Sequence, residues 1–213
     1  MVRGSGERQV DLASLYPEPR TRDPEPDVVP GPKGFPSQAV LRKLKLVLFD
    51  VDGVLSDGRI VLNDDGEQTK FFHVRDGAGI TLLQNGGLMA GVVTGRMSNV
   101  VNVRAKELKI PPERVRQGAV VKAPAVKQLL SELNVAADET GYVGDDLIDM
   151  PVLELVGVAC CPADAYREVL AACHVVSKKK GGRGAVRSIC EFLLKARDDG
   201  SWERAVDIYL GRA

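Results

Sequence analysis

The sequence lacks the features that mark membrane, secreted and nucleic-acid-binding proteins. No apolar run among its 213 residues approaches the roughly 20 needed to cross a bilayer, and the N-terminus has no charged-then-apolar signal pattern. Lysine plus arginine equal aspartate plus glutamate at 29 each, so the net charge points to neither nucleic acid nor an anionic membrane. We therefore expect a soluble, cytoplasmic protein, and small-molecule chemistry remains open.

Cysteine and histidine patterns typical of disulfides or zinc sites are also missing. The four cysteines form no CxxC pair, and adjacent Cys160 and Cys161 have poor geometry for a mutual disulfide. We expect them to be buried, reduced thiols. His73 and His174 have no partner at metal-site spacing, so we expect structural roles for both.

Composition divides the chain into three parts. Residues 1–40 hold seven of the twelve prolines and little apolar periodicity, which predicts a disordered or loosely attached extension. Residues 41–197 carry the patterns of one folded domain. Residues 198–213 are expected to form a C-terminal tail or helix.

Apolar runs alternate with helix-like segments along this domain. Residues 45–49, 88–93 and 140–144 are predicted to be fully buried strands. Between the last two, apolar residues recur at i, i+3, i+4 and i+7 from Val126 to Leu133, the period of an amphipathic helix. The alternation predicts an α/β fold, a parallel sheet with helices on both faces.

A turn sequence interrupts this alternation. Two strand-like runs, residues 59–62 and 68–72, flank NDDG at 63–66. This arrangement predicts a β-hairpin directly after the first buried strand.

Polar residues end the three predicted strands, namely Asp50, Thr94 and Asp145. Ligands of parallel sheets bind beyond the carboxyl ends of the strands. Phosphate esters resist hydrolysis because an anionic centre repels nucleophiles, so their cleavage needs a nucleophile, a proton donor and positive charge. Asp50 can attack phosphorus and form an aspartyl-phosphate, while Asp52 can protonate the leaving oxygen and later deprotonate water. Gly53 permits the tight turn that brings both carboxylates to one substrate.

Other polar side chains supply the positive charge that this chemistry requires. Oxygen ligands suit Mg²⁺, and Asp145 is the natural further donor beside Asp50 and Asp52. Asp146 or Asp149 could contact Asp145 and Lys122 on the side away from the substrate and so orient them.

Thr94 and Lys122 are the expected contacts to the phosphoryl group. Thr94 offers a hydroxyl to a phosphate oxygen, and Lys122 offsets the charge of the phosphoryl oxygens. Each is ambiguous alone, since DxDG arises by chance before a solvated turn, Thr94 could be a helix cap and Lys122 a surface residue. Their order along the chain favours the catalytic interpretation.

At these residues the chain resembles the haloacid dehalogenase superfamily. More narrowly, it resembles the capless family of 3-deoxy-D-manno-octulosonate 8-phosphate phosphatases. The four superfamily motifs match Asp50 with Asp52, Thr94, Lys122, and Asp145 with Asp149. The closer match lies in DVDGVLSDGRI (50–60), FFHVRDGAGI (71–80), QGAVVK (117–122), YVGDDLIDMPVLELVG (142–157) and GGRGAVR (181–187).

The resemblance implies a Rossmann-like core and hydrolysis of that sugar acid phosphate in lipopolysaccharide precursor synthesis. It also implies a Mg²⁺ held by the side chains of Asp50 and Asp145 and the carbonyl of Asp52, in a homotetramer. Ser56 stands where the family usually has threonine, His73 where it has asparagine and Ser188 where it has glutamate.

The spacing of the motifs leaves no room for a cap domain, because only 44 positions separate Asp50 from Thr94 and 23 separate Lys122 from Asp145. An uncapped site would be open to water, so we expect a neighbouring chain to cover it.

Three arginines are candidates for binding the substrate. Arg75 could pair with its carboxylate, Arg96 lies beside the second motif, and Arg183 lies on a glycine-rich stretch that could reach a neighbour's site.

Two other functions, and a third with less support, remain open at this point. The substrate could be a nine-carbon sugar acid 9-phosphate of the sialic acid type. The chain could be a non-catalytic oligomerisation module, although Asp50, Asp52, Thr94, Lys122 and Asp145 are all present. A phosphomutase is disfavoured because it would need a closed cap.

Overall fold

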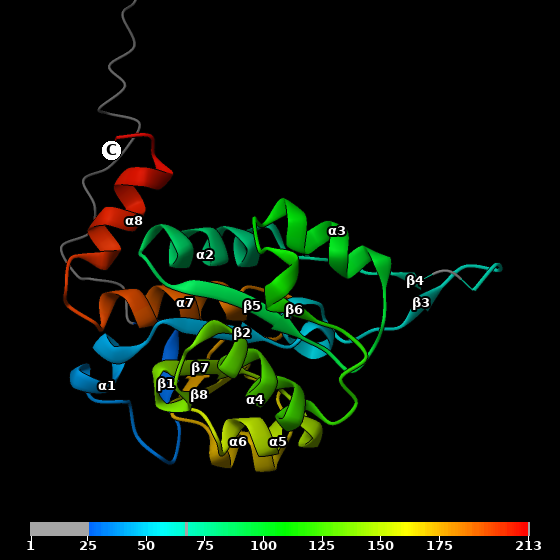
Figure 1. Ribbon diagram of the computed structural model, residues 1–213, viewed down its shortest axis with the longest axis horizontal. Helices are drawn as coiled ribbons and strands as arrows, with labels where there is room; N and C mark the ends of the chain where they lie inside the picture. The colour runs from blue at the N-terminus through cyan, green and yellow to red at the C-terminus, as the bar shows by residue number, and fades with distance from the viewer. Residues whose placement is uncertain (1–25, 67, 213) are drawn as a thin grey trace, which may run out of the picture.

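A seven-stranded sheet covered by helices on both faces forms the body of the protein (Figure 1). The computed structural model describes residues 26–66 and 68–212. The strand order is β1-β9-β8-β7-β2-β5-β6, and all neighbours are parallel except β1 and β9. This confirms the predicted α/β, Rossmann-like fold class.

Strands and α-helices alternate along the chain except at β2, β3 and β4 and at the last two helices. The strands are β1 (Val28–Pro30), β2 (Leu46–Phe49), β3 (Val61–Leu62), β4 (Gln68–Thr69), β5 (Met89–Val93), β6 (Val115–Arg116), β7 (Thr140–Val143), β8 (Val158–Cys161) and β9 (Val175–Ser177). The helices are α1 (Gln38–Lys43), α2 (Val74–Asn85), α3 (Asn99–Glu107), α4 (Lys122–Leu133), α5 (Met150–Leu153), α6 (Arg167–Ala172), α7 (Ala185–Lys195) and α8 (Ser201–Tyr209).

Strand β2 lies in the middle of the sheet between β7 and β5. Its four side chains are all fully buried, because successive residues of a strand point to opposite faces and both faces are covered. Val47 and Phe49 join one hydrophobic cluster, and Leu46 and Leu48 join the other. Asp50, the next residue, therefore emerges at the centre of the carboxyl edge of the sheet.

Helices α2, α3, α7 and α8 pack over one face, and α4, α5 and α6 over the other (Figure 1). Within the C-terminal segment 198–213, residues Ser201–Tyr209 form the helix α8. Its Ala205 is fully buried, Trp202 packs against the core, and α8 lies against α2 and α7. The ammonium of Lys195 lies 4.4 Å from the centre of the Trp202 ring, a cation–π contact.

The N-terminal boundary of the folded domain lies earlier than expected. Residues 1–25 of the predicted extension fall outside the described residues. Strand β1 pairs antiparallel with β9 and buries Val28, and α1 begins at Gln38 with Ser37 as its N-cap. The prediction of a loose segment up to residue 40 was wrong for these residues. Strand β9 would otherwise be an open edge, and even a short proline-containing strand can pair there.

The predicted hairpin is present as β3 and β4, which project away from the body of the protein (Figure 1). Each strand pairs over only two residues, shorter than predicted, because the described chain adds no third strand and an isolated hairpin is marginal in water. In the described residues, the segment from Asp50 to Thr94 holds a short helical turn, this hairpin, α2 and β5, and the segment from Lys122 to Asp145 holds α4, a short turn and β7. As predicted, these described residues form no cap domain.

All four cysteines are buried free thiols, as predicted. His174 has a structural role, since its Nδ1 accepts a hydrogen bond from the Ala159 amide at 3.0 Å. In the parts of the chain that the structure covers, no helix combines the length and apolarity needed to cross a membrane.

Asp76 connects α2 to α7. It is 1% exposed, and its two carboxylate oxygens accept hydrogen bonds from the amides of Gly184 at 3.0 Å and Arg187 at 2.9 Å. These amides lie at the start of α7, where a helix leaves its first N–H groups without partners. Asp76 therefore fixes the end of the glycine-rich stretch to the core.

We expect Asp76→Ala to lower the free energy of unfolding by about 1–3 kcal/mol, because one buried and one partly buried amide lose their acceptor. Urea unfolding measures this change. Asp207→Ala, an exposed position on α8, should stay within about 0.5 kcal/mol of the unmodified protein. Equal stabilities of the two variants would contradict the capping role.

Candidate active site

The carboxyl ends of the three central strands bring the predicted site residues together. Asp50 follows β2, Thr94 follows β5 and Asp145 comes two residues after the end of β7, and these strands are neighbours in the sheet. A cleft of about 240 Å³ opens at this edge. Its lining comprises Asp50, Asp52, Gly58, Thr94, Gly95, Arg96, Asp145, Asp146 and Ile148.

Gly53 is required by a close approach between two loops. It has φ +89°, and a Cβ atom at this position would lie 1.9 Å from Asp145 Oδ2. Any residue with a Cβ atom would therefore clash with the Asp145 carboxylate, which lines the cleft. The glycine of the first motif thus allows the loops after β2 and β7 to meet.

Lys122 lies beneath the cleft, 1% exposed, with its ammonium between two carboxylates. Its Nζ is 2.9 Å from Asp50 Oδ1 and 2.6 Å from Asp149 Oδ1. Burial alone would lower the pKa of Lys122, but Asp50 and Asp149 outweigh it and hold the pKa above its ordinary value. The lysine is therefore a cation that touches the predicted nucleophile.

Asp149 orients this lysine. Its Oδ1 accepts hydrogen bonds from Lys122 and, at 2.6 Å, from the Tyr142 hydroxyl, while Oδ2 accepts from the amides of Asp145 at 3.0 Å and Asp146 at 3.2 Å. Burial, reinforced by Asp149, raises the pKa of Tyr142 well above its ordinary value, so the phenol keeps its proton and donates. Of the two residues predicted to orient Lys122 and Asp145, Asp149 contacts both, through the lysine ammonium and the Asp145 amide.

Asp146 is exposed and caps its own turn, accepting from the Leu147 amide at 2.7 Å. Tyr142 was not singled out in the sequence, because a tyrosine in a buried strand looks like any other core residue.

The acidic cluster fits a divalent cation. Asp50, Asp145 and Asp149 each place one oxygen within 4.8 Å of the others. Asp149 already accepts four hydrogen bonds, whereas Asp145 Oδ1 is buried with no hydrogen-bond partner in the described part of the chain.

The raised pKa values of the clustered carboxyls also favour a bound cation. Burial, with repulsion from Asp50 and Asp149, raises the pKa of Asp145 to about 8. Burial also raises the pKa of Asp50 to about 6, although Lys122 opposes the rise. A cation between Asp50 and Asp145 would relieve this repulsion, and oxygen ligands suit Mg²⁺.

Asp52 has a partner that the sequence motifs do not include. Its Oδ1 pairs with the ammonium of Lys70, whose side chain is only 5% exposed, and accepts from the Ser56 hydroxyl at 3.4 Å. Its Oδ2 is buried and has no hydrogen-bond partner in residues 26–66 and 68–212. Lys70 follows β4, within a run that the sequence marks only as a strand.

The second motif places a hydroxyl and a guanidinium at the cleft. Thr94 is buried, and its backbone bonds to Arg116 and Ala119 on the neighbouring segment fix its position. Its Oγ1 accepts from the Arg96 amide at 3.4 Å. The Arg96 side chain is exposed and lines the cleft, whereas Arg75 is exposed at the start of α2 and is not among the lining residues.

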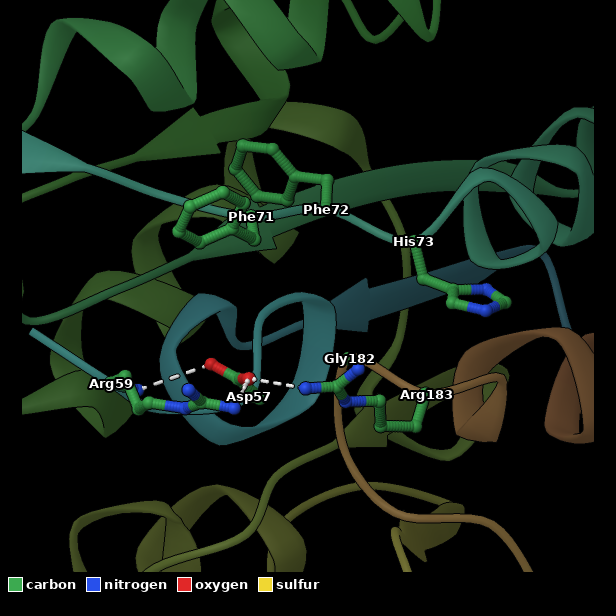
Figure 2. Close-up of a pocket in the computed structure, with 7 residues that line it drawn as sticks. All are labelled: Asp57, Arg59, Phe71, Phe72, His73, Gly182 and Arg183. Atoms are coloured by element: carbon green, nitrogen blue, oxygen red, sulfur yellow. Dashed lines mark hydrogen bonds and ion pairs between the residues drawn. The ribbon is translucent and has the colours of Figure 1, made fainter. Parts of the chain in front are cut away.

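A second pocket, of about 310 Å³, lies between the base of the hairpin and the glycine-rich stretch. Figure 2 shows Phe71 and Phe72 across this pocket from Asp57, whose carboxylate pairs with Arg59 and Arg183 at 3.0 Å each. It adjoins the cleft along the chain, since Gly58 lines the cleft and its neighbours line this pocket.

The glycine-rich stretch is packed on the first motif of its own chain. The Gly182 amide donates to Val54 O at 2.9 Å, and a Cβ at Gly181 would lie 1.7 Å from Gly53 O. Arg183 therefore points into the pocket described above, with its side chain about half exposed.

Comparisons with known proteins agree with this geometry. The family model of haloacid dehalogenase-like hydrolases matches residues 114–189. The chain is 41% identical over 155 residues to the 3-deoxy-D-manno-octulosonate 8-phosphate phosphatase of Yersinia pestis, covering 73% of this chain and 82% of the relative. It is 40% identical over 167 residues to that of Escherichia coli K12, covering 78% and 88%.

Solved structures show the same similarity. The 3-deoxy-D-manno-octulosonate 8-phosphate phosphatase of Moraxella catarrhalis, in complex with magnesium, phosphate and KDO, superposes with a TM-score of 0.75 at 34% identity over 81% of this chain and 97% of that one. The cobalt-bound deoxy-D-mannose-octulosonate 8-phosphate phosphatase of Haemophilus influenzae gives 0.71 at 36% identity over 75% and 92%.

The fold and the carboxylates, threonine and buried lysine at its strand ends define the class of haloacid dehalogenase-like hydrolases. The sequence identity to the phosphatases named above extends over most of their length, so the chain can be assigned to one family within this class. The chain belongs to the family of 3-deoxy-D-manno-octulosonate 8-phosphate phosphatases.

We expect Mg²⁺ to raise the melting temperature of the chelator-treated protein, and Asp145→Asn to remove most of that rise. The substitution deletes the charge of a buried, unpartnered oxygen, while binding at a hundredfold excess over Kd would stabilise by about 2.7 kcal/mol. Thermal unfolding with and without Mg²⁺ measures the effect. The exposed control Asp138→Asn should keep the rise, and an undiminished rise in Asp145→Asn would contradict this site.

Proposed function

We propose that this chain hydrolyses 3-deoxy-D-manno-octulosonate 8-phosphate to the free sugar acid and phosphate, a step in lipopolysaccharide precursor synthesis. The observation that carries the proposal is the buried Lys122 between Asp50 and Asp149 at the edge of a fold shared with phosphatases of that name. A non-catalytic module would have no need of a buried cation against a potential nucleophile. The cytoplasmic location stays a prediction.

Asp50 is the proposed nucleophile. Its carboxylate attacks phosphorus in line, a bond forms between carboxylate oxygen and phosphorus, and the ester bond to the sugar breaks. Lys122 and the Thr94 hydroxyl hold the phosphoryl oxygens near the point of attack. Asp50, Asp145 and the carbonyl of Asp52 would hold Mg²⁺, which would supply further positive charge there.

Asp52 is the proposed acid and base. It gives a proton to the departing sugar oxygen and later removes one from the water that cleaves the aspartyl-phosphate. Its place in the lining of the same cleft as Asp50 supports both steps. Arg96 lines this cleft, which supports a role in binding the substrate. The pairing of Arg75 with the substrate carboxylate and the reach of Arg183 to a neighbour's site remain predictions.

The substrate assignment is tested by kcat/KM for the eight-carbon 8-phosphate and a nine-carbon sugar acid 9-phosphate. We expect a clear preference for the eight-carbon substrate, because the named relatives act on it. Asp50→Asn should lose essentially all activity on both while its sedimentation stays unchanged. A preference for the nine-carbon substrate would overturn the substrate assignment, and full activity in Asp50→Asn would remove the nucleophile.

Self-assembly into a homotetramer, with a neighbouring chain covering the cleft, is part of the proposal. Large apolar side chains are exposed on the hairpin and around the cleft, a pattern typical of interaction surfaces. They include Phe71 at 66% and Met97 at 79% exposed, with Ile60, Leu62, Val120, Val121 and Ile148. A neighbour packed here would remove this surface from water and close the open site.

We expect Leu62→Glu, at the projecting hairpin, to lower the oligomeric mass and kcat/KM together, since it puts a charge into the proposed interface. Analytical ultracentrifugation and steady-state kinetics measure the two effects. Val103→Glu, equally exposed on α3, is the control and should change neither. A fully active monomer at all concentrations would contradict the proposal.

A further inference from the structure

Lys70 is a buried cation outside the four motifs. Its side chain is 5% exposed and its ammonium pairs with Asp52 Oδ1. Burying an ammonium is unfavourable unless it is paired, so this contact fixes the position of both side chains. A buried lysine on the residue after β4 also links the hairpin to the cleft.

The two oxygens of Asp52 have different surroundings. Oδ1 is held by Lys70 and lies 3.4 Å from the Ser56 hydroxyl, which also lies 3.3 Å from Val51 O. Oδ2 is buried and unpartnered in the described chain. The carboxylate is thus fixed in one rotation, with one oxygen occupied and one left for another partner.

We infer that Lys70 is the positioning residue that aims Asp52 at the leaving oxygen, an inference that rests on the proposed function. As the Asp50–phosphorus bond forms and the phosphorus–ester bond breaks, the proton on Asp52 Oδ2 passes to the ester oxygen. The charge left on Asp52 then faces the Lys70 ammonium through Oδ1, and this partly buried ion pair stabilises it. In the second half, Oδ2 takes a proton from water as that water attacks phosphorus and releases Asp50.

This role differs from direct phosphate binding. A lysine that touched the phosphoryl group would stabilise every phosphate monoester alike. A lysine that acts through the acid matters only where the leaving group needs a proton. Alkyl phosphates such as a sugar phosphate need it, whereas p-nitrophenyl phosphate leaves as a stable phenolate and does not.

The test is kcat/KM of Lys70→Met on the sugar acid 8-phosphate and on p-nitrophenyl phosphate. We expect a loss of about 100-fold on the sugar phosphate and under about fivefold on the aryl phosphate, in line with typical contributions of general acids. Lys70→Arg should recover most of the loss. Lys45→Met, which removes a surface lysine paired with Glu139, should change neither value.

The ratio of the two values within one variant is independent of how much protein is folded. Lys70→Gln gives the same comparison with a side chain that keeps a polar end. Equal losses on both substrates, or no loss on either, would overturn the positioning role. If the unmodified protein does not hydrolyse the sugar acid phosphate, the proposed function is wrong, but the positioning role of Lys70 can still be tested. Any alkyl phosphate that the protein does hydrolyse then replaces the sugar acid phosphate in the comparison with p-nitrophenyl phosphate.

Discussion

The ammonium of Lys122 lies between the carboxylates of Asp50 and Asp149, and the arrangement of the site depends on this contact. It joins the end of β2, the start of α4 and the loop after β7, which are far apart in the sequence. Breaking a buried ion pair by removing one partner costs about 3–5 kcal/mol, because the other charge stays buried and unpaired. Asp149 extends the network to Tyr142 and to the backbone of Asp145.

Close contacts between loops complete this network. Gly53 lets the first motif lie against Asp145, and Gly181 lets the glycine-rich stretch lie against Gly53. Asp76, in turn, anchors the end of that stretch by capping α7. The result brings three acidic side chains around one point, and burial, with repulsion between these carboxylates, raises the pKa of Asp50 and Asp145 and favours a bound cation.

Much of the fold and of the candidate site could be predicted from the sequence, because the central strands are buried on both faces and end at polar residues. The runs before Asp50, Thr94 and Asp145 can be seen without any contact information. Tyr142 and Lys70 could not be predicted, because their roles come from partners 7 and 18 positions away that only the fold brings close. Strand β1 could not be predicted from the sequence, because its three residues are too few to show a periodicity and lie near prolines. It forms because the edge of β9 is free to pair with it.

The central claim is that this network presents Asp50 to phosphorus as a nucleophile. The most direct measurement is rapid quenching during turnover with labelled substrate, followed by digestion and mass spectrometry of the labelled peptide. We expect a transient acid-stable, base-labile phosphoryl group on Asp50, absent in Asp50→Asn. A label on another residue, or full turnover with no labelled protein at any time, would contradict it.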